Sequence, residues 1–122
     1  MSERHYPMNP QQLPPVVPAI APASIAPGTK HDSDKPRWDL LPHHAVAQVV
    51  AVLSFGAQKY EPDNWRAVQG WRWRYYAAAW RHAVAWWLGE RHDPESGLHH
   101  LAHAACCMLF LLELDMTDGG AR

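Results

Sequence analysis

Residues 81–114 read RHAVAWWLGERHDPESGLHHLAHAACCMLFLLEL, and this stretch decides the fold. Apolar residues recur at helical spacing on both sides of a short polar connection. Gly89 is a natural stop for the first helix. We therefore expect helices over about 71–88 and 94–115, and the short connection predicts that they are antiparallel neighbours.

The start of the second of these helices is marked by Asp93, Pro94 and Glu95, which are typical of an N-cap, a first helical position and an acid in the first turn. A further helix is predicted over about 43–58, because Pro42 stands at a favoured place for helix initiation. Its apolar positions at helical spacing are Val46, Val49, Val50, Leu53 and Ala57. No strand signal and no internal repeat is found, so the predicted fold is an all-α, small helical bundle.

The chain has 122 residues, which suits one compact domain, and 48% of them are apolar. A single domain of this size is marginally stable, so we expect a homo-oligomer, either a dimer or a tetramer. The formal net charge of −1 and the pI of about 6.7 give no overall basic excess for binding nucleic acid. A local basic group is interpreted as a solvated helix face and consists of Arg66, Arg72, Arg74 and Arg81.

Cysteine usage and the absence of targeting signals indicate a cytoplasmic protein. Cys106 and Cys107 are neighbours, and successive helix residues point about 100° apart, so no bridge is expected between them. The sequence shows no framework of spaced cysteines, no secretory signal and no apolar run of about 20 residues. We therefore expect a reducing, cytoplasmic location, that of the host cell if the chain is phage-encoded, and no membrane partner.

Seven of the eleven prolines lie in residues 1–29. Proline fixes φ and removes a hydrogen-bond donor, so neither a helix nor a central strand can run through this region. We interpret it as an extended arm that is either a flexible tail or laid across a partner. Residues 30–116 form the predicted folded domain, and residues 117–122 a flexible tail.

The predicted helix over 94–115 has two different sides on a helical wheel at about 100° per residue. The side interpreted as core carries Leu98, Leu101, Ala102, Ala105, Met108, Leu109 and Leu112. The opposite side carries Glu95, His99, His100, His103 and Cys107. Imidazoles and a carboxylate on one side of a helix indicate a specific site if the helix packs in a bundle or an oligomer.

Three acids, Glu90, Asp93 and Glu95, stand at the corner between the last two helices. Ionised acids so close together repel one another, and a divalent cation removes that repulsion. In the preceding helix His82 is flanked by small alanines, which leave room for something besides a side chain. Oxygen ligands with one or two imidazoles suit Mg²⁺ or Mn²⁺. The predicted metal ligands are Glu90, Asp93, Glu95, His82, His100 and His103.

Each of these residues also has a structural explanation. Asp93 is explained as a helix cap, Glu95 as a first-turn acid, and His99 as an i, i+4 partner of that acid. None of these explanations accounts for the position of His100 and His103 on the same side of the helix as Glu95. That coincidence favours a joint site. Zinc is the competing metal, but the HExxH pattern is absent and the adjacent cysteines lack zinc-ligand spacing.

Two further clusters carry candidate contacts to phosphate and a base. The first, FGAQKYEPDNWR, covers residues 55–66. In it Lys59 offers a cation for phosphate, Asn64 paired donor and acceptor groups for a base edge, and Trp65 a flat face for stacking. The alternative is a tryptophan that anchors the loop onto the core and a solvated lysine. The second cluster is the pair of cations that flank the rigid Pro36. The candidate substrate-binding residues are Lys35, Arg37, Lys59, Asn64 and Trp65.

Taken together, these blocks resemble a known family. The chain looks like the phage dATP/dGTP diphosphohydrolases, the MazZ-type branch of the MazG-like all-α nucleotide pyrophosphohydrolases, in DKPRWDLLP, FGAQKYEPDNWR and the stretch over residues 81–114. The resemblance covers about residues 30–115, and the combination of its blocks is hard to reach by chance. It implies that residues 30–116 are a MazG-like catalytic domain whose small bundle is completed by oligomerisation.

The resemblance also implies an activity. Such an enzyme hydrolyses a purine deoxynucleoside triphosphate, dGTP or dATP, toward the monophosphate with Mg²⁺ or Mn²⁺. In phages that carry 2-aminoadenine instead of adenine, it would supply dGMP for the modified base and drain dATP. MazG-like enzymes hold their metals with acid pairs spaced E-x-x-E and E-x-x-D on two antiparallel helices. Here His100 and His103 stand at that spacing, and Glu90 and Asp93 have it across a turn.

The catalytic hypothesis assigns the chemistry to Glu90, Asp93 and His103. The two acids help to hold divalent ions against the triphosphate, and a metal-bound water gives its proton to a carboxylate or to His103. A second ion and the candidate cations stabilise charge on the leaving phosphates. The rival hypotheses are a house-cleaning pyrophosphatase that acts on many nucleotides and a nucleotide-binding module without turnover.

Overall fold

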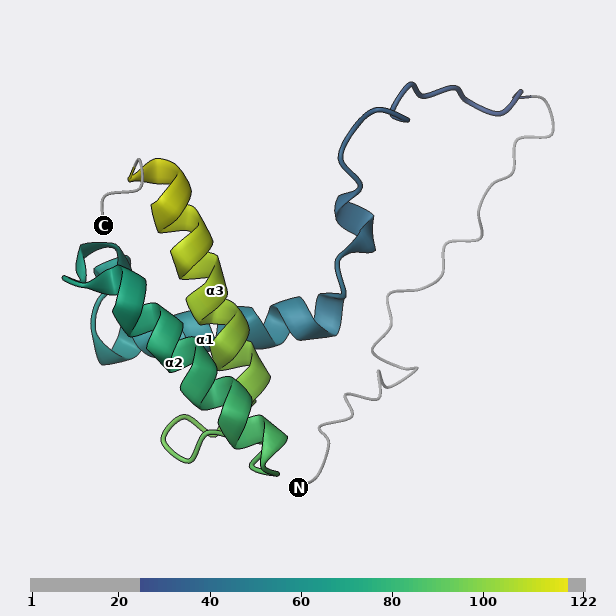
Figure 1. Cartoon of the computed structure of the whole chain (residues 1–122). Helices are drawn as coiled ribbons and strands as arrows, with labels where there is room; N and C mark the ends of the chain where they lie inside the picture. Colours follow the sequence, from purple (N-terminus) through teal and green to yellow (C-terminus); the bar gives the residue numbers. More distant parts are fainter. Residues whose placement is uncertain (1–24, 119–122) are drawn as a thin grey trace. The chain divides into compact units, whose positions relative to one another are not determined.

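The structure is a computed structural model that describes residues 25–118 of the chain. The chain divides into two compact units, Met1–Pro36 and Arg37–Arg122. The elements of the second unit are η1 Trp38–Leu40, α1 His43–Lys59, η2 Asn64–Ala67, α2 Trp71–Trp87 and α3 His100–Thr117 (Figure 1). No strand occurs among the residues that the structure describes, and the predicted all-α fold is therefore confirmed.

In the first unit, residues 25–36 form no helix or strand. The Lys35 N–H donates to the Asp32 carbonyl at 3.0 Å and closes a turn. The arm predicted for residues 1–29 lies largely outside the described residues, and so does most of the predicted C-terminal tail.

Two of the three predicted helices agree with the structure to within one residue at each end. α1 follows Pro42, whose φ of −71° suits a helix N-terminus, and it closes with the Tyr60 N–H donating to the Gly56 carbonyl at 2.9 Å. α2 follows Gly70, at φ +70°, and Gly89 comes shortly after its end, at φ +105°. Because glycine has no Cβ to clash at positive φ, these two glycines delimit α2.

The prediction for the third helix is wrong at its start. α3 begins at His100 instead of residue 94, because Gly97 adopts a φ of +72° that cannot continue a right-handed helix. The N-cap is His99, whose Nδ1 accepts the Leu101 N–H at 3.0 Å. The expected first turn of the helix is therefore part of the connection between α2 and α3.

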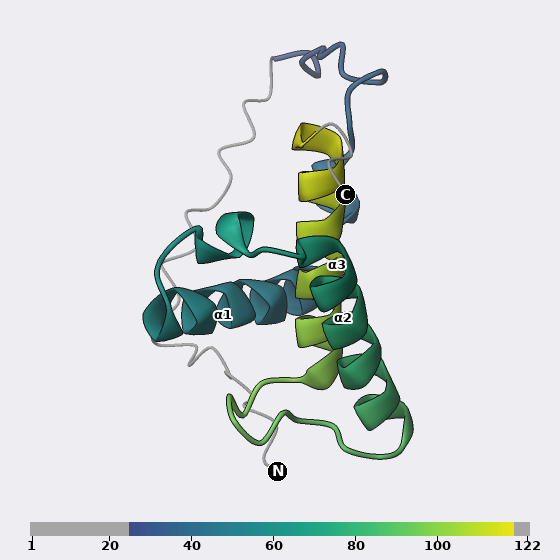
Figure 2. The same cartoon turned by 60° about the vertical axis from the view of Figure 1, so that its left-hand side comes forward.

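α2 and α3 lie side by side in antiparallel directions, and α1 runs across α3 (Figures 1 and 2). The predicted antiparallel arrangement is thus confirmed. Ala79 of α2 is 1% exposed, and its small side chain lets the two helices approach closely. A small core forms where α1 meets α3, and it contains Val52, Ala102 and Cys106 with the partly buried Val49, Leu98 and Phe110 packed against it.

The burial of α3 differs from the prediction over much of its surface, although Ala102 and, just before the helix, Leu98 belong to the core as expected. Most of the side expected in the core is open to solvent, since Leu101, Met108, Leu109 and Leu112 are 37–58% exposed. The histidine side faces the interior instead, and its buried residues are His100, Cys106, Cys107 and Leu114. Periodicity distinguishes two sides of a helix, but it does not say which neighbour covers each of them.

Among the described helices, α3 is long and apolar enough to cross a membrane by length and composition alone, with a mean hydropathy of 1.2. The core helix of a globular domain meets the same criterion. α3 carries the buried His100, and both α1 and α2 pack on it (Figure 2). One side of α3 is thus covered by the other helices, while 28% of the helix is buried in all.

Replacing Ala79 by Leu is expected to lower the free energy of unfolding by roughly 1–3 kcal/mol, because the larger side chain cannot fit between α2 and α3 without moving them. The matched control is Ala47→Leu on the exposed side of α1, which should change this free energy by less than about 0.5 kcal/mol. Chemical denaturation followed by circular dichroism measures both values. Equal effects would show that the helices do not pack closely at Ala79.

Candidate functional site

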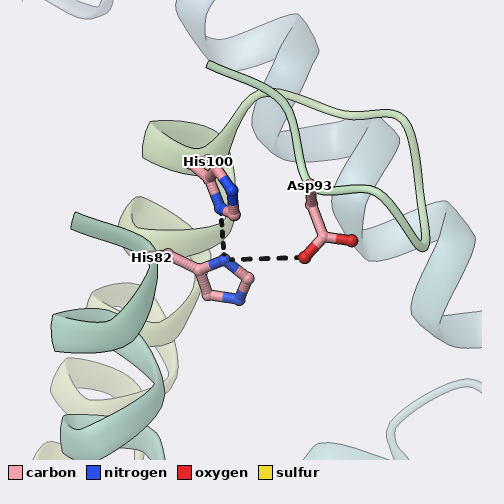
Figure 3. Close-up of side chains that lie close together, drawn as sticks. All are labelled: His82, Asp93 and His100. Carbon is pink, nitrogen blue, oxygen red and sulfur yellow. Dashed lines mark hydrogen bonds and ion pairs between the residues drawn. The ribbon is translucent and has the colours of Figure 1, made fainter. Parts of the chain in front are cut away.

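The connection between α2 and α3 holds the carboxylate of Asp93 in place. The Asp93 N–H donates to the Leu98 carbonyl at 2.8 Å. Its Oδ1 accepts the N–H groups of Glu95 and Ser96, at 2.9 Å each. The other oxygen, Oδ2, is left directed at His82, 3.9 Å from the imidazole Nδ1 (Figure 3). The backbone of the turn therefore orients this carboxylate toward α2.

Three histidines from the two packed helices meet beside this carboxylate. His82 of α2 has its Nδ1 2.9 Å from the Nδ1 of His100 on α3, which is 18 residues away in the sequence (Figure 3). The His82 ring also stacks on His103, with ring centroids 4.5 Å apart. His103 is in turn hydrogen-bonded through its Nε2 to the Ser96 hydroxyl at 2.7 Å. The pairing of α2 with α3 thus creates the cluster.

Glu90 extends the arrangement on the far side of His100. Its Oε1 lies 2.7 Å from the His100 Nε2. A carboxylate only accepts hydrogen bonds, so the His100 Nε2 donates to Glu90. The His100 Nδ1 then faces the Nδ1 of His82 and can accept a hydrogen bond from it. The contact with Glu90 therefore turns the opposite ring nitrogen of His100 toward His82.

The donor atoms of His82, Asp93 and His100 fit a single metal ion. One ligand atom from each residue lies within 4.8 Å of the other two. Two imidazole nitrogens and one carboxylate oxygen form a mixed donor set of the kind that first-row transition ions such as Mn²⁺ accept. His100 is 4% exposed, so its ring is fixed by packing and by its two hydrogen bonds.

Burial lowers the pKa values of His82 and His103 and so favours their neutral forms. The pKa of His82 is lowered to about 4, first by burial and then by the charges of His103 and His100. Burial also lowers the pKa of His103. Burial alone would raise the pKa of Asp93, but the backbone N–H groups that it accepts outweigh burial, and the net shift is downward. Near neutral pH the neutral His82 and His103 and the ionised Asp93 are in the charge states that bind metals, and His82 binds through Nδ1 once its ring proton lies on Nε2.

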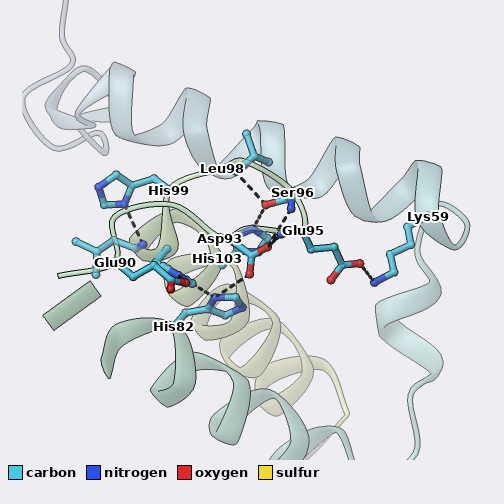
Figure 4. A network of polar contacts seen from close by, with 11 residues as sticks. Lys59, His82, Glu90, Asp93, Glu95, Ser96, Leu98, His99 and His103 are labelled. Atoms are coloured by element: carbon cyan, nitrogen blue, oxygen red, sulfur yellow. Dashed lines mark hydrogen bonds and ion pairs between the residues drawn. The ribbon is translucent and has the colours of Figure 1, made fainter. Parts of the chain in front are cut away.

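Each acid at the corner has its own partner, which differs from the convergence expected from the sequence. Glu90 contacts His100, as described above, while Asp93 accepts backbone N–H groups. Glu95 pairs with Lys59 at the end of α1, and its side chain is 61% exposed (Figure 4). Asp93 is thus the acid that shares a donor cluster with histidines. The ligand roles of Glu90, Glu95 and His103 stay predictions.

A cavity of about 820 Å³ lies beside the cluster, between the C-terminal half of α1, the loop through Asn64, α2 and α3. His82, Asp93 and His103 line it, so a ligand in the cavity can reach the cluster. Pockets for small ligands typically measure about 300–1,000 Å³, and this cavity is large enough for a nucleotide.

The predicted contacts from residues 55–66 are all placed at this cavity. Lys59, Asn64 and Trp65 line it. The Trp65 ring stacks on Phe110 with centroids 4.3 Å apart, and the Arg66 guanidinium lies 4.2 Å from the Trp65 centroid. At these distances the two groups cannot share one face, so both faces of the indole are covered. This arrangement fits the alternative in which Trp65 anchors the loop, and a contact of its ring with a base stays a prediction.

Of the other predicted phosphate contacts, Arg37 does not line the cavity. Arg37 forms a two-pronged ion pair with Asp39, with nitrogen–oxygen distances of 2.7 and 2.6 Å. Lys35 belongs to the other compact unit of the chain. The roles of Lys35 and Arg37 in binding phosphate therefore stay predictions.

Sequence reasoning missed the roles of Ser96, Arg74 and Arg81. The contact of Ser96 with His103 depends on the geometry of the turn before α3 and has no signal in the sequence. The two arginines, interpreted as part of a solvated face, are exposed, and they also line the cavity. They did carry a signal, because residues 74, 78, 81 and 82 fall on one side of α2 at about 100° per residue.

The sequence of residues 25–121 matches a known family, described as dATP/dGTP diphosphohydrolase, N-terminal. The chain belongs to this family. A dATP/dGTP diphosphohydrolase of Salmonella phage PMBT28 is 36% identical over 87 residues, which make up 71% of the chain. The chain spans about 29% of the length of this curated relative. No solved structure matches the chain. The resemblance to the phage dATP/dGTP diphosphohydrolases is thus confirmed.

The candidate site lies wholly within the region that matches the dATP/dGTP diphosphohydrolase family. That region contains the His82, Asp93 and His100 cluster and the complete lining of the cavity. The donor cluster and the cavity therefore lie in the part of this chain that matches the family.

The depressed pKa of His82 predicts that the metal-free protein loses stability in acid. An unfolded chain takes up a proton at the ordinary histidine pKa of about 6.5, whereas the folded His82 takes it up only at about 4. The unfolded state therefore binds more protons between these values, so the free energy of unfolding falls as the pH is lowered from about 6.5 toward 4. Denaturation at a series of pH values, with a chelator present, measures this slope.

The variant His82→Gln should flatten the slope, because it removes one group that protonates in the unfolded state alone. The matched control is His44→Gln on the exposed surface of α1, which should leave the slope of the wild type unchanged. If the wild type and His82→Gln showed the same slope, the burial of a neutral His82 would be refuted.

Proposed function

We propose that the chain provides the active site of a metal-dependent diphosphohydrolase that converts the purine deoxynucleoside triphosphates dGTP and dATP toward their monophosphates. The observation that carries this proposal is the cluster of His82, Asp93 and His100 beside a cavity of about 820 Å³. The family match and the phage relative, both described as dATP/dGTP diphosphohydrolases, support the substrate class.

His82, Asp93 and His100 would hold a divalent cation, Mn²⁺ or Mg²⁺. When bound, such an ion lowers the pKa of a coordinated water and neutralises charge on phosphate oxygens. The two imidazoles favour Mn²⁺, because Mg²⁺ prefers oxygen ligands. Glu90, Glu95 and His103 would join the ligands only by exchanging their present partners, which are His100, Lys59 and Ser96.

Other residues of the chain position these groups and move protons. Glu90 accepts the Nε2 proton of His100 and so keeps the opposite ring nitrogen turned toward the cluster. His103, kept neutral by burial, is the candidate to accept the proton of an attacking water, and the Ser96 hydroxyl holds its ring in place. Lys59 would stabilise the leaving phosphates by exchanging Glu95 for the substrate.

In an infected cell the proposed reaction would raise the supply of dGMP and lower the pool of dATP. The phage origin of the 36% identical relative supports this setting. A supply of dGMP for 2-aminoadenine synthesis is the role that the resemblance to MazZ-type enzymes implies, and it stays a prediction for this chain.

Exposed apolar residues on α2 and α3 support a homo-oligomer. The α2 stripe consists of Trp73, Tyr76, Trp80, Val84 and Trp87, which are 43–78% exposed. The α3 stripe consists of Leu101, Met108, Leu109, Leu112 and Met116. Contiguous apolar surface of this kind marks interaction sites. Covering both stripes with another copy of the chain would complete the small bundle.

Hydrolysis of dGTP and dATP should require a divalent cation and the charge of Asp93. Asp93→Asn keeps a side-chain oxygen for the turn but removes the charged ligand, so kcat/KM should fall by at least about 100-fold with the helix content unchanged. Glu95→Gln, a nearby acid outside the donor cluster, should lose less than about 10-fold. Chromatography of the products, with each deoxynucleotide and with or without Mn²⁺, measures both losses.

If Asp93→Asn hydrolyses the nucleotides as fast as the wild type, the proposed site is ruled out. If Asp93→Asn and Glu95→Gln lower kcat/KM equally, Glu95 is also a metal ligand. Equal rates with all nucleotides would favour a house-cleaning pyrophosphatase over a purine-specific enzyme. Metal-independent binding without products would favour a nucleotide-binding module.

Trp80→Asp should shift the chain from an oligomer toward a monomer, because it places a charge in the middle of the apolar α2 stripe. Light scattering coupled to gel filtration measures the mass against the 13.8 kDa of one chain. Arg72→Asp lies on the same helix outside the stripe and should keep the oligomer. A wild-type mass of a single chain would contradict the proposed association.

A further inference from the structure

Two arginines line the cavity and have no role in the mechanism described above. Arg74 and Arg81 both lie on α2, with the small Ala78 between them, and all three residues line the cavity. At about 1.5 Å of rise per residue, the two arginines start about 10 Å apart along the helix axis. One rigid helix therefore presents two guanidinium groups to the same cavity.

Arg74 and Arg81 line the cavity and, unlike Lys59, form no ion pair with a carboxylate in the part of the chain that the structure describes. Among the described residues, no carboxylate forms an ion pair with Arg74 or Arg81. Arg74 donates one long hydrogen bond of 3.3 Å, to the Gln69 carbonyl. The third lining cation, Lys59, is already paired with Glu95. The cavity thus contains positive charge that is available to an anion.

Arg81 lies at the end of the cavity that adjoins the donor cluster. It directly precedes His82 in the chain, and Arg81, His82 and Cys107 all line the cavity. Arg74 lies about two turns closer to the start of α2. A ligand that contacts both arginines and the cluster must therefore extend along α2.

We propose that Arg81 and Arg74 form a polyphosphate-binding wall in this cavity. Arg81 binds the phosphate groups next to the cluster of His82, Asp93 and His100, and Arg74 binds the anion further along α2. The planar fork of a guanidinium matches two phosphate oxygens at once. Ala78 leaves the space between the arginines open to the ligand. This proposal rests on the proposed function in one respect only, namely that the polyphosphate belongs to a nucleotide.

Inorganic tripolyphosphate tests the wall without requiring turnover. Isothermal titration calorimetry of the full chain in metal-free buffer should show that Arg81→Ala raises the Kd for tripolyphosphate by at least about ten-fold. Arg81→Lys should restore part of the affinity, because lysine keeps the charge but loses the fork. Arg74→Ala should weaken binding as well. The matched control, Arg72→Ala, alters an exposed arginine of α2 outside the cavity lining and should bind like the wild type.

The same variants in hydrolysis of dGTP with Mn²⁺ separate this inference from the proposed function. We expect Arg81→Ala to raise KM by at least about ten-fold. If the wild type hydrolyses dGTP and Arg81→Ala keeps both its KM and its affinity for tripolyphosphate, the wall is wrong and the proposed function stands. If no nucleotide is hydrolysed while tripolyphosphate binding still depends on Arg81, the proposed function is wrong and the wall stands. A wild type that does not bind tripolyphosphate at millimolar concentrations would also overturn the wall.

Discussion

One oxygen of the Asp93 carboxylate accepts two backbone N–H groups of the turn that follows it, and the other faces His82. Hydrogen bonds to an ionised carboxylate are stronger than those between neutral groups, so the turn and the carboxylate hold each other in place. Because the turn ends at Gly97 with a positive φ, the chain leaves it in a direction that returns α3 along α2. Every contact between the histidines of the two helices depends on that return.

The charge state in which the histidine cluster is buried suits both folding and metal binding. A charged imidazole is costly to bury, and the lowered pKa values of His82 and His103 express that cost. Glu90 and His82 satisfy the two ring nitrogens of His100, and no buried side-chain nitrogen or oxygen lacks a partner among the described residues. The burial that keeps the helices together therefore also favours the neutral forms of His82 and His103, the charge state in which an imidazole can bind a metal.

The site occupies the side of α3 that would otherwise be core. The buried apolar cluster around Val52, Ala102 and Cys106 is small, and the larger side chains of α2 and α3 remain exposed on the opposite sides. A helix that uses its inner side for histidines must find other apolar contacts for stability, since burial of apolar surface is the main favourable contribution to folding. This division of α3 gives a physical reason for the association that we propose.

The sequence by itself determined the number and order of the helices, the bounds of α1 and α2, and the family, because these follow from local signals and from contiguous motifs, but it placed the start of α3 six residues too early. Pro42, Gly70 and Gly89 act on their own backbone, and helical periodicity is read within a few residues. Only the tertiary structure decided which side of α3 is buried, which partner each acid takes, and that Trp65 stacks on Phe110 while Arg81 lines the cavity. These outcomes depend on contacts between residues far apart in the chain, and periodicity on one helix carries no information about the neighbour that packs against it.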